Sequence, residues 1–61
     1  MYYEINVSLN GTHFFATAER SLRDQEHAHR VAQELKLRFP KSQGFEISMV
    51  KWHKHGNEVE I

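Results

Sequence analysis

The sequence predicts a small α+β domain: an antiparallel sheet with one helix packed on one face, in the order β-β-α-β or β-β-α-β-β. Two observations support this prediction. Residues 2–18 alternate apolar and polar side chains on either side of Asn10-Gly11, and apolar residues recur at three- and four-residue spacing between residues 28 and 39. The first pattern is typical of a β-hairpin and the second of an amphipathic helix. At 61 residues the chain is expected to form a single domain, 1–61.

The hairpin is predicted over residues 2–18. Asn10-Gly11 separates the two alternating segments, and a type I′ turn needs a positive φ at both central residues, which Asn and Gly tolerate best. A two-residue turn also determines the register, so we expect Val7 to face Phe14. This register places Phe15 on the opposite face of the sheet.

A helix is predicted over about residues 22–39. Pro40 ends it, because the residue before a proline is driven out of the α region. Two starts are open: Ser21, which has Asp24 three residues later as in a capping box, or Asp24 as the cap itself. The predicted buried face consists of Ala28, Val31, Ala32, Leu35 and Phe39.

A third strand is predicted over about residues 45–54. A short fourth strand over 58–61 is left open, with Gly56-Asn57 as the turn that would lead into it. If Gly56-Asn57 is a two-residue turn, Val59 and Ile61 lie on the same side of the sheet as Trp52.

One helix can cover only one face of a small sheet. A contiguous apolar patch on the other face usually marks an interaction site. We therefore expect a homodimer, through this face or through a sheet edge, and a different protein is the second choice of partner. Two other interpretations stay open: the aromatic rings stack on unpaired bases, or a bulge near residue 50 turns Trp52 into the core. The predicted interface residues are Tyr2, Phe15, Val50 and Trp52.

The charges balance overall but are unevenly placed. Eight basic and eight acidic residues give a net charge of zero. Between residues 20 and 41, six basic residues face three acidic ones (Arg20, Arg23, Arg30, Lys36, Arg38 and Lys41 against Asp24, Glu26 and Glu34). This excess suggests an alternative function as a nucleic-acid-binding module, although a solvated helix surface has the same pattern. The candidate contacts to an anionic partner are Arg23, Arg30, Arg38 and Lys41.

Metal binding and catalysis have little support. His53 and His55 share one side of the predicted third strand and could bind a metal together. Without an established third ligand, we interpret them as cross-strand partners of Glu60 and Glu58. No nucleophile, base and orienting group come together in a predicted pocket, so neither an enzyme nor a cofactor is predicted.

The remaining composition narrows the class of protein. The chain contains no cysteine, which excludes disulfides and cysteine-ligated zinc. The sequence lacks a signal-peptide pattern and an apolar run of membrane-spanning length, so we expect a cytoplasmic protein that does not act at a membrane. The sequence as a whole favours a small non-enzymatic protein-interaction module: an adaptor, inhibitor or regulator.

Overall fold

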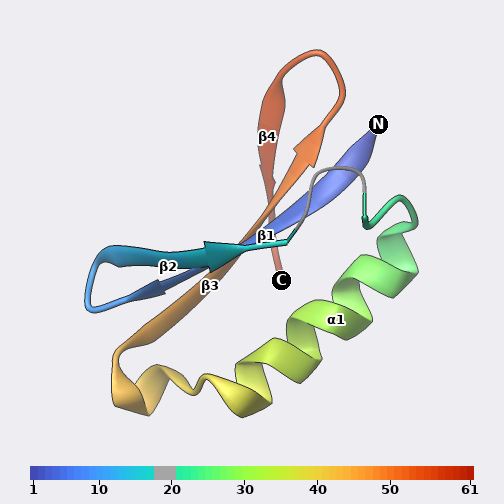
Figure 1. Cartoon of the computed structure of the whole chain (residues 1–61). Helices are drawn as coiled ribbons and strands as arrows, with labels where there is room; N and C mark the ends of the chain where they lie inside the picture. The colour runs from blue at the N-terminus through green and yellow to red at the C-terminus, as the bar shows by residue number, and fades with distance from the viewer. Residues whose placement is uncertain (18–20) are drawn as a thin grey trace.

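A computed structural model describes residues 1–17 and 21–61 and confirms the α+β fold. Four antiparallel strands form one sheet in the order β2-β1-β3-β4, and the helix packs against one face (Figure 1). Within the described residues, no helix is long and apolar enough to cross a bilayer. The elements are β1 (Tyr2–Leu9), β2 (Thr12–Ala16), α1 (Gln25–Arg38), a 3-10 turn (Lys41–Gln43), β3 (Phe45–Trp52) and β4 (Gly56–Val59).

The turn between β1 and β2 has the predicted conformation. Asn10 has φ 51° and Gly11 has φ 83°, both in the left-handed region that a type I′ turn requires. Leu9 pairs with Thr12, as the two-residue turn demands. The Asn10 N–H donates to the Gly44 carbonyl at 2.8 Å, which ties the tip of the hairpin to the start of β3.

A β-bulge changes the register further along this hairpin. The pairing shifts between Val7 and Ser8, so Val7 lies opposite Phe15 instead of Phe14. A bulge sets two residues of one strand against one residue of its neighbour. The prediction that Phe15 lies on the outer face, away from the helix, is therefore wrong. Residue 18, where the hairpin was predicted to end, lies outside the described residues.

The helix begins at Gln25, which is the later of the two starts that the sequence left open. Asp24 is the N-cap, and its Oδ2 accepts a hydrogen bond from the His27 N–H at 3.0 Å. Leu22 is not helical because it extends the sheet: its carbonyl accepts from the Tyr3 N–H at 2.6 Å. The helix ends at Arg38, and Phe39 is the C-cap, as Pro40 predicts.

The core lies between α1 and the central strands. Ala28 and Ala32 are fully buried, so the small side chains of the helix let it approach the sheet closely. Ile5, Val7 and Met49, on the strands that face the helix, are also fully buried. The whole buried set is Tyr3, Ile5, Val7, Leu22, Ala28, Ala32 and Met49, with Val31, Leu35, Ile47, Val59 and Ile61 packed against it.

The second hairpin has a different register from the predicted one. Trp52 pairs with Gly56, so the connection is a three-residue loop, 53–55, and Gly56-Asn57 belongs to β4. The indole of Trp52 lies directly over Gly56, where an added Cβ would come within 2.8 Å of the ring. This packing explains why a glycine occupies the paired position. The shift also puts Val59 and Ile61 against the core, which corrects their predicted place beside Trp52.

We predict that Gly11→Val destabilises the fold by about 1–2 kcal/mol, because a β-branched residue is strained at positive φ. No atom lies within 4 Å of a Cβ added at Gly11, so backbone strain is the only source of the loss. Urea unfolding measures the change. The neighbouring exposed strand residue provides the control, since Thr12→Val should leave the midpoint nearly unchanged. Equal midpoints for the wild type and Gly11→Val would contradict the turn assignment.

Candidate functional site

Four phenylalanine rings, Phe14, Phe15, Phe39 and Phe45, meet at one end of the molecule and form the phenylalanine cluster. The ring centroid of Phe39 lies 5.1 Å from that of Phe45, 5.5 Å from Phe15 and 6.0 Å from Phe14. Phe14 also contacts all three other rings, with centroids 5.5 Å from Phe15 and 5.8 Å from Phe45. All these contacts are edge-to-face, the geometry that the quadrupoles of aromatic rings favour.

Each ring reaches the cluster for a local reason. The bulge brings both Phe14 and Phe15 to the helix side of β2, where both contact Phe39. Phe39 is the residue at which α1 ends before Pro40. Phe45 opens β3 directly after Gly44, whose φ of 94° turns the chain back into the sheet.

The cluster is only partly covered. Phe14 is 52% exposed, and the other three rings are half-buried. The two other exposed large apolar side chains among the described residues, Met1 and Leu37, lie outside the cluster. A half-exposed ring on top of three others is a more continuous apolar surface than an isolated exposed leucine, and such surfaces often mark interaction sites.

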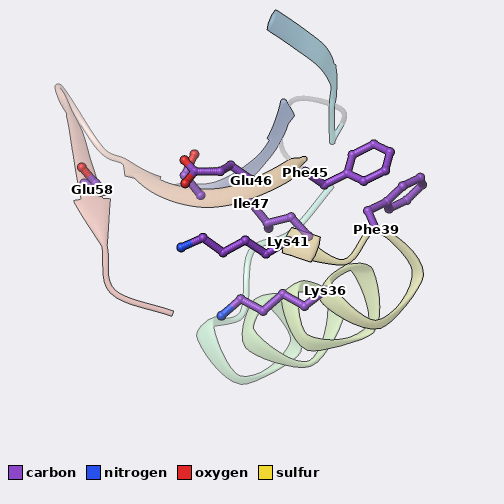
Figure 2. A pocket seen from close by; sticks show the side chains of 8 residues that line it. Lys36, Phe39, Lys41, Phe45, Glu46, Ile47 and Glu58 are labelled. Carbon is purple, nitrogen blue, oxygen red and sulfur yellow. The ribbon is translucent and has the colours of Figure 1, made fainter. Parts of the chain in front are cut away.

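A cleft of about 410 Å³ adjoins the cluster (Figure 2). Its lining includes four consecutive residues of β3, numbers 45–48. Successive side chains of a strand point to opposite faces, so four consecutive lining residues mean that the cleft follows the edge of the strand. The full lining is Lys36, Phe39, Lys41, Phe45, Glu46, Ile47, Ser48 and Glu58.

This edge is open because β4 is short. β4 pairs only with residues 49–52 of β3, so among the described residues no strand pairs with 45–48 on that side. Beyond Val59 the chain continues toward α1, where the Lys36 Nζ donates to the Ile61 carbonyl at 2.7 Å. The backbone of the first half of β3 therefore borders the cleft directly.

The charged groups of the cleft are divided between its two sides. Lys36 comes from α1 and Lys41 from the 3-10 turn, both on the helix side (Figure 2). Glu46 and Glu58 belong to the outer face, because Glu58 pairs with Val50 and alternation puts both carboxylates opposite the buried Met49. A ligand in the cleft would meet cations on one side and anions on the other.

Three of the four predicted interface residues lie on the outer face. The rings of Tyr2 and Trp52 stack with centroids 6.4 Å apart and planes inclined by 22°, and the Trp52 Nε1–H donates to Glu4 Oε1 at 3.4 Å. The β1–β3 register is regular through Val50, so no bulge turns Trp52 inward. Phe15 is separated from these three residues, which leaves a smaller apolar patch than predicted.

The outer patch is also less apolar than the sequence suggested. Tyr2, Val50 and Trp52 are each half-buried. Val50 lies between two carboxylates, because its cross-strand neighbours are Glu4 on β1 and Glu58 on β4. The outer patch is therefore a narrow apolar strip bordered by acidic side chains.

The four predicted anion contacts do not form one basic surface. Arg23 precedes α1 and Lys41 follows it, so they lie at opposite ends of a 14-residue helix, about 20 Å apart at 1.5 Å per residue. Arg30 follows Glu26 and precedes Glu34 at four-residue spacing, and Arg38 Nη2 lies 3.4 Å from Glu34 Oε1. This helix surface alternates in sign.

The two histidines proposed as weak metal candidates lie in the loop between β3 and β4. The His53 N–H donates to the His55 carbonyl at 3.3 Å, and neither residue is in a strand. They do not face Glu60 and Glu58, because the three-residue loop changes the register. Within the described part of the chain, no three His, Cys, Asp or Glu side chains are grouped as metal ligands would be.

Sequence reasoning missed the phenylalanine cluster. One sequence feature could have indicated it: Phe14 and Phe15 are consecutive aromatic residues that interrupt the apolar–polar alternation of β2. An interruption of this kind in a strand is consistent with a bulge, which places neighbouring residues against one partner.

We predict that Phe39→Ala costs more stability than Phe14→Ala. Each of the two rings contacts the other three rings of the cluster, but Phe39 is half-buried and Phe14 is 52% exposed. The expected losses are about 2 kcal/mol for Phe39→Ala and under about 1 kcal/mol for Phe14→Ala. Urea unfolding of both variants and of the double variant measures each loss and the coupling between the rings. Equal losses without coupling would show that the rings do not pack together.

Comparison with known proteins gave no match, whether to a protein-family model, to a curated protein or to a solved structure.

Proposed function

We propose that this chain is a small non-enzymatic protein-interaction module that binds a polypeptide at the phenylalanine cluster and the adjoining cleft. One observation carries the proposal: the half-exposed ring of Phe14 lies over the same end of the molecule as the unpaired edge of β3. Exposed aromatic surface and open strand edges are both features that proteins commonly cover with a partner.

The composition of the cleft supports a polypeptide ligand. Phe39, Phe45 and Ile47 provide apolar contacts, and two lysines and two glutamates surround them. Protein interfaces typically have this arrangement, with an apolar centre and a polar rim. The polar lining comprises lysine, glutamate and serine side chains, and it lacks histidine, the commonest general base.

Self-association through the outer patch is a second candidate. Tyr2 and Trp52 are paired across β1 and β3, and Val50 lies two residues from Trp52 on the same face. Two copies packed sheet on sheet would bury this strip in an isologous interface. This surface lies opposite the helix and borders the outer side of the cleft, because Val50 pairs with Glu58.

Nucleic acid is the less supported partner. A phosphate backbone requires clustered cations, whereas the arginines of α1 alternate with glutamates and Arg38 is paired with Glu34. The outer face adds Glu4, Glu46 and Glu58, which would repel phosphate.

We predict that Phe14 contributes directly to ligand binding. Peptides selected from a random displayed library against the full chain should bind Phe14→Ser at least about fivefold more weakly than the wild type, the loss typical of a contact that matters in an interface. Leu37→Ser is the matched control, since Leu37 is 79% exposed but lies outside the cluster. Selected peptides that bind both variants as tightly as the wild type, or a selection that enriches no peptide, would contradict the proposal.

We predict that Val50→Lys breaks any dimer formed through the outer patch. The new ammonium would lie between Glu4 and Glu58, so the monomer should stay folded. The same charge could not be buried against a second sheet without cost. Light scattering on the wild type and the variant over a concentration series measures the mass. A dimer that persists in Val50→Lys, or a wild type that stays monomeric, would rule out this mode of association.

A further inference from the structure

We infer that the open edge of β3 accepts an extended peptide as an added antiparallel strand, with a basic residue opposite Glu46 and apolar residues at the two neighbouring positions. The inference rests on the proposed function, because it names the class of partner for the same cleft. Strand addition is a common mode of peptide recognition, in which main-chain hydrogen bonds give affinity and alternate side chains give specificity.

The backbone groups available for pairing follow from the register of the sheet. The two-residue turn makes Leu9 and Thr12 a hydrogen-bonded pair, so the N–H and C=O of Leu9 point toward β2. Those of Ser8 then point toward β3, where Ser8 pairs with Glu46. By the same alternation, the N–H and C=O groups of Phe45 and Ile47 point to the open edge and away from β1.

The other two strand edges are less suited to pairing. β2 carries the bulge at Phe14 and Phe15, and bulges on edge strands disrupt the regular row of donors and acceptors. The open part of the β3 edge, residues 45–48, is as short as the outer edge of β4, but β4 is a four-residue strand held by β3 alone. The β3 edge, in contrast, is part of a regular eight-residue strand held along its whole length by β1.

The charges of the cleft determine which peptide would fit. Residues opposite Phe45 and Ile47 would point to the helix side, toward Phe39 and the two lysines. Apolar side chains suit this environment, and basic ones would be repelled. The residue opposite Glu46 would point to the outer side, where Glu58 also lines the cleft, so a lysine or arginine would be favoured there. The expected pattern is apolar–basic–apolar.

The same geometry disfavours a second copy at this edge. Two copies could pair at this edge only by matching the free N–H and C=O groups of Phe45 and Ile47. In an antiparallel pair, Phe45 of one copy then lies opposite Ile47 of the other. This register places the two Glu46 side chains directly opposite each other. Like charges at such a pair destabilise an antiparallel ladder. A charged residue on an exposed strand edge is also a known means of preventing edge-to-edge association.

The test uses the full ¹⁵N-labelled chain and the peptide acetyl-Val-Lys-Val-Thr-Thr-amide, titrated by NMR. With its lysine opposite Glu46, this peptide ends before Met49, which already pairs with Val59. Binding should shift the amide signals of Phe45 and Ile47 and slow their hydrogen exchange, because the peptide satisfies these groups. The same peptide with Glu in place of Lys should bind up to about fivefold more weakly, as expected for one cross-strand charge pair. A peptide with both valines N-methylated should not bind, because it lacks the donors.

A charge reversal gives the sharpest control. Glu46 is exposed, so Glu46→Lys should keep the fold and reverse the preference, binding the Glu peptide more tightly than the Lys peptide. Glu26→Lys makes the same change of charge on the exposed first turn of α1 and should leave the preference unchanged.

Four results would overturn the inference. Equal binding of the Lys and Glu peptides to the wild type would remove the proposed role of Glu46. Shifts at Phe14 and Phe39 without protection of the Phe45 and Ile47 amides would mean that peptides bind the phenylalanine cluster by side chains, which keeps the proposed function and rejects strand addition. Concentration-dependent protection of these amides without peptide would make the occupant a second copy. If neither these peptides nor a displayed library gives any ligand, the proposed function fails as well.

Discussion

The β-bulge opposite Val7 determines where this protein displays its apolar surface. Without it, the Asn10-Gly11 turn would place Phe15 on the outer face beside Asn6. With it, Phe14 and Phe15 both lie on the helix side and pack against Phe39. The outer face keeps only a narrow strip between carboxylates, and the larger exposed aromatic surface is at the end of the molecule where α1 meets β3.

A second constraint is the packing of Trp52 over Gly56, which sets the register of β3 and β4. In this register Val59 reaches the core, and pairing along β3 stops at Met49. The short fourth strand thus has two effects: it completes the hydrophobic core and it leaves the first half of β3 without a neighbour. A domain of this size is only marginally stable. Its sheet nevertheless leaves the backbone groups of one strand unpaired next to the core.

The cleft depends on both the β-bulge and the short β4. Phe39 and Phe45 form an aromatic wall of the cleft, and the bulge packs Phe14 and Phe15 against this wall. The short β4 exposes the strand edge that forms another wall. The carboxylates lie on the outer side and the lysines on the helix side, so the cleft distinguishes the two faces of any strand that enters it. Glu46 lies at the centre of the open edge, where one charge can oppose self-pairing and favour a basic ligand.

Local sequence patterns by themselves determined the fold class, the turn at Asn10-Gly11, the end of the helix at Pro40 and most of the buried face, because each depends on residues close together in the chain. They also placed Tyr2, Val50 and Trp52 on the outer face. Only the tertiary structure decided the bulge, the three-residue loop after Trp52 and hence the cleft. These features depend on contacts between distant residues, such as Phe14 and Phe15 with Phe39, and alternation along a strand does not encode which register such contacts stabilise.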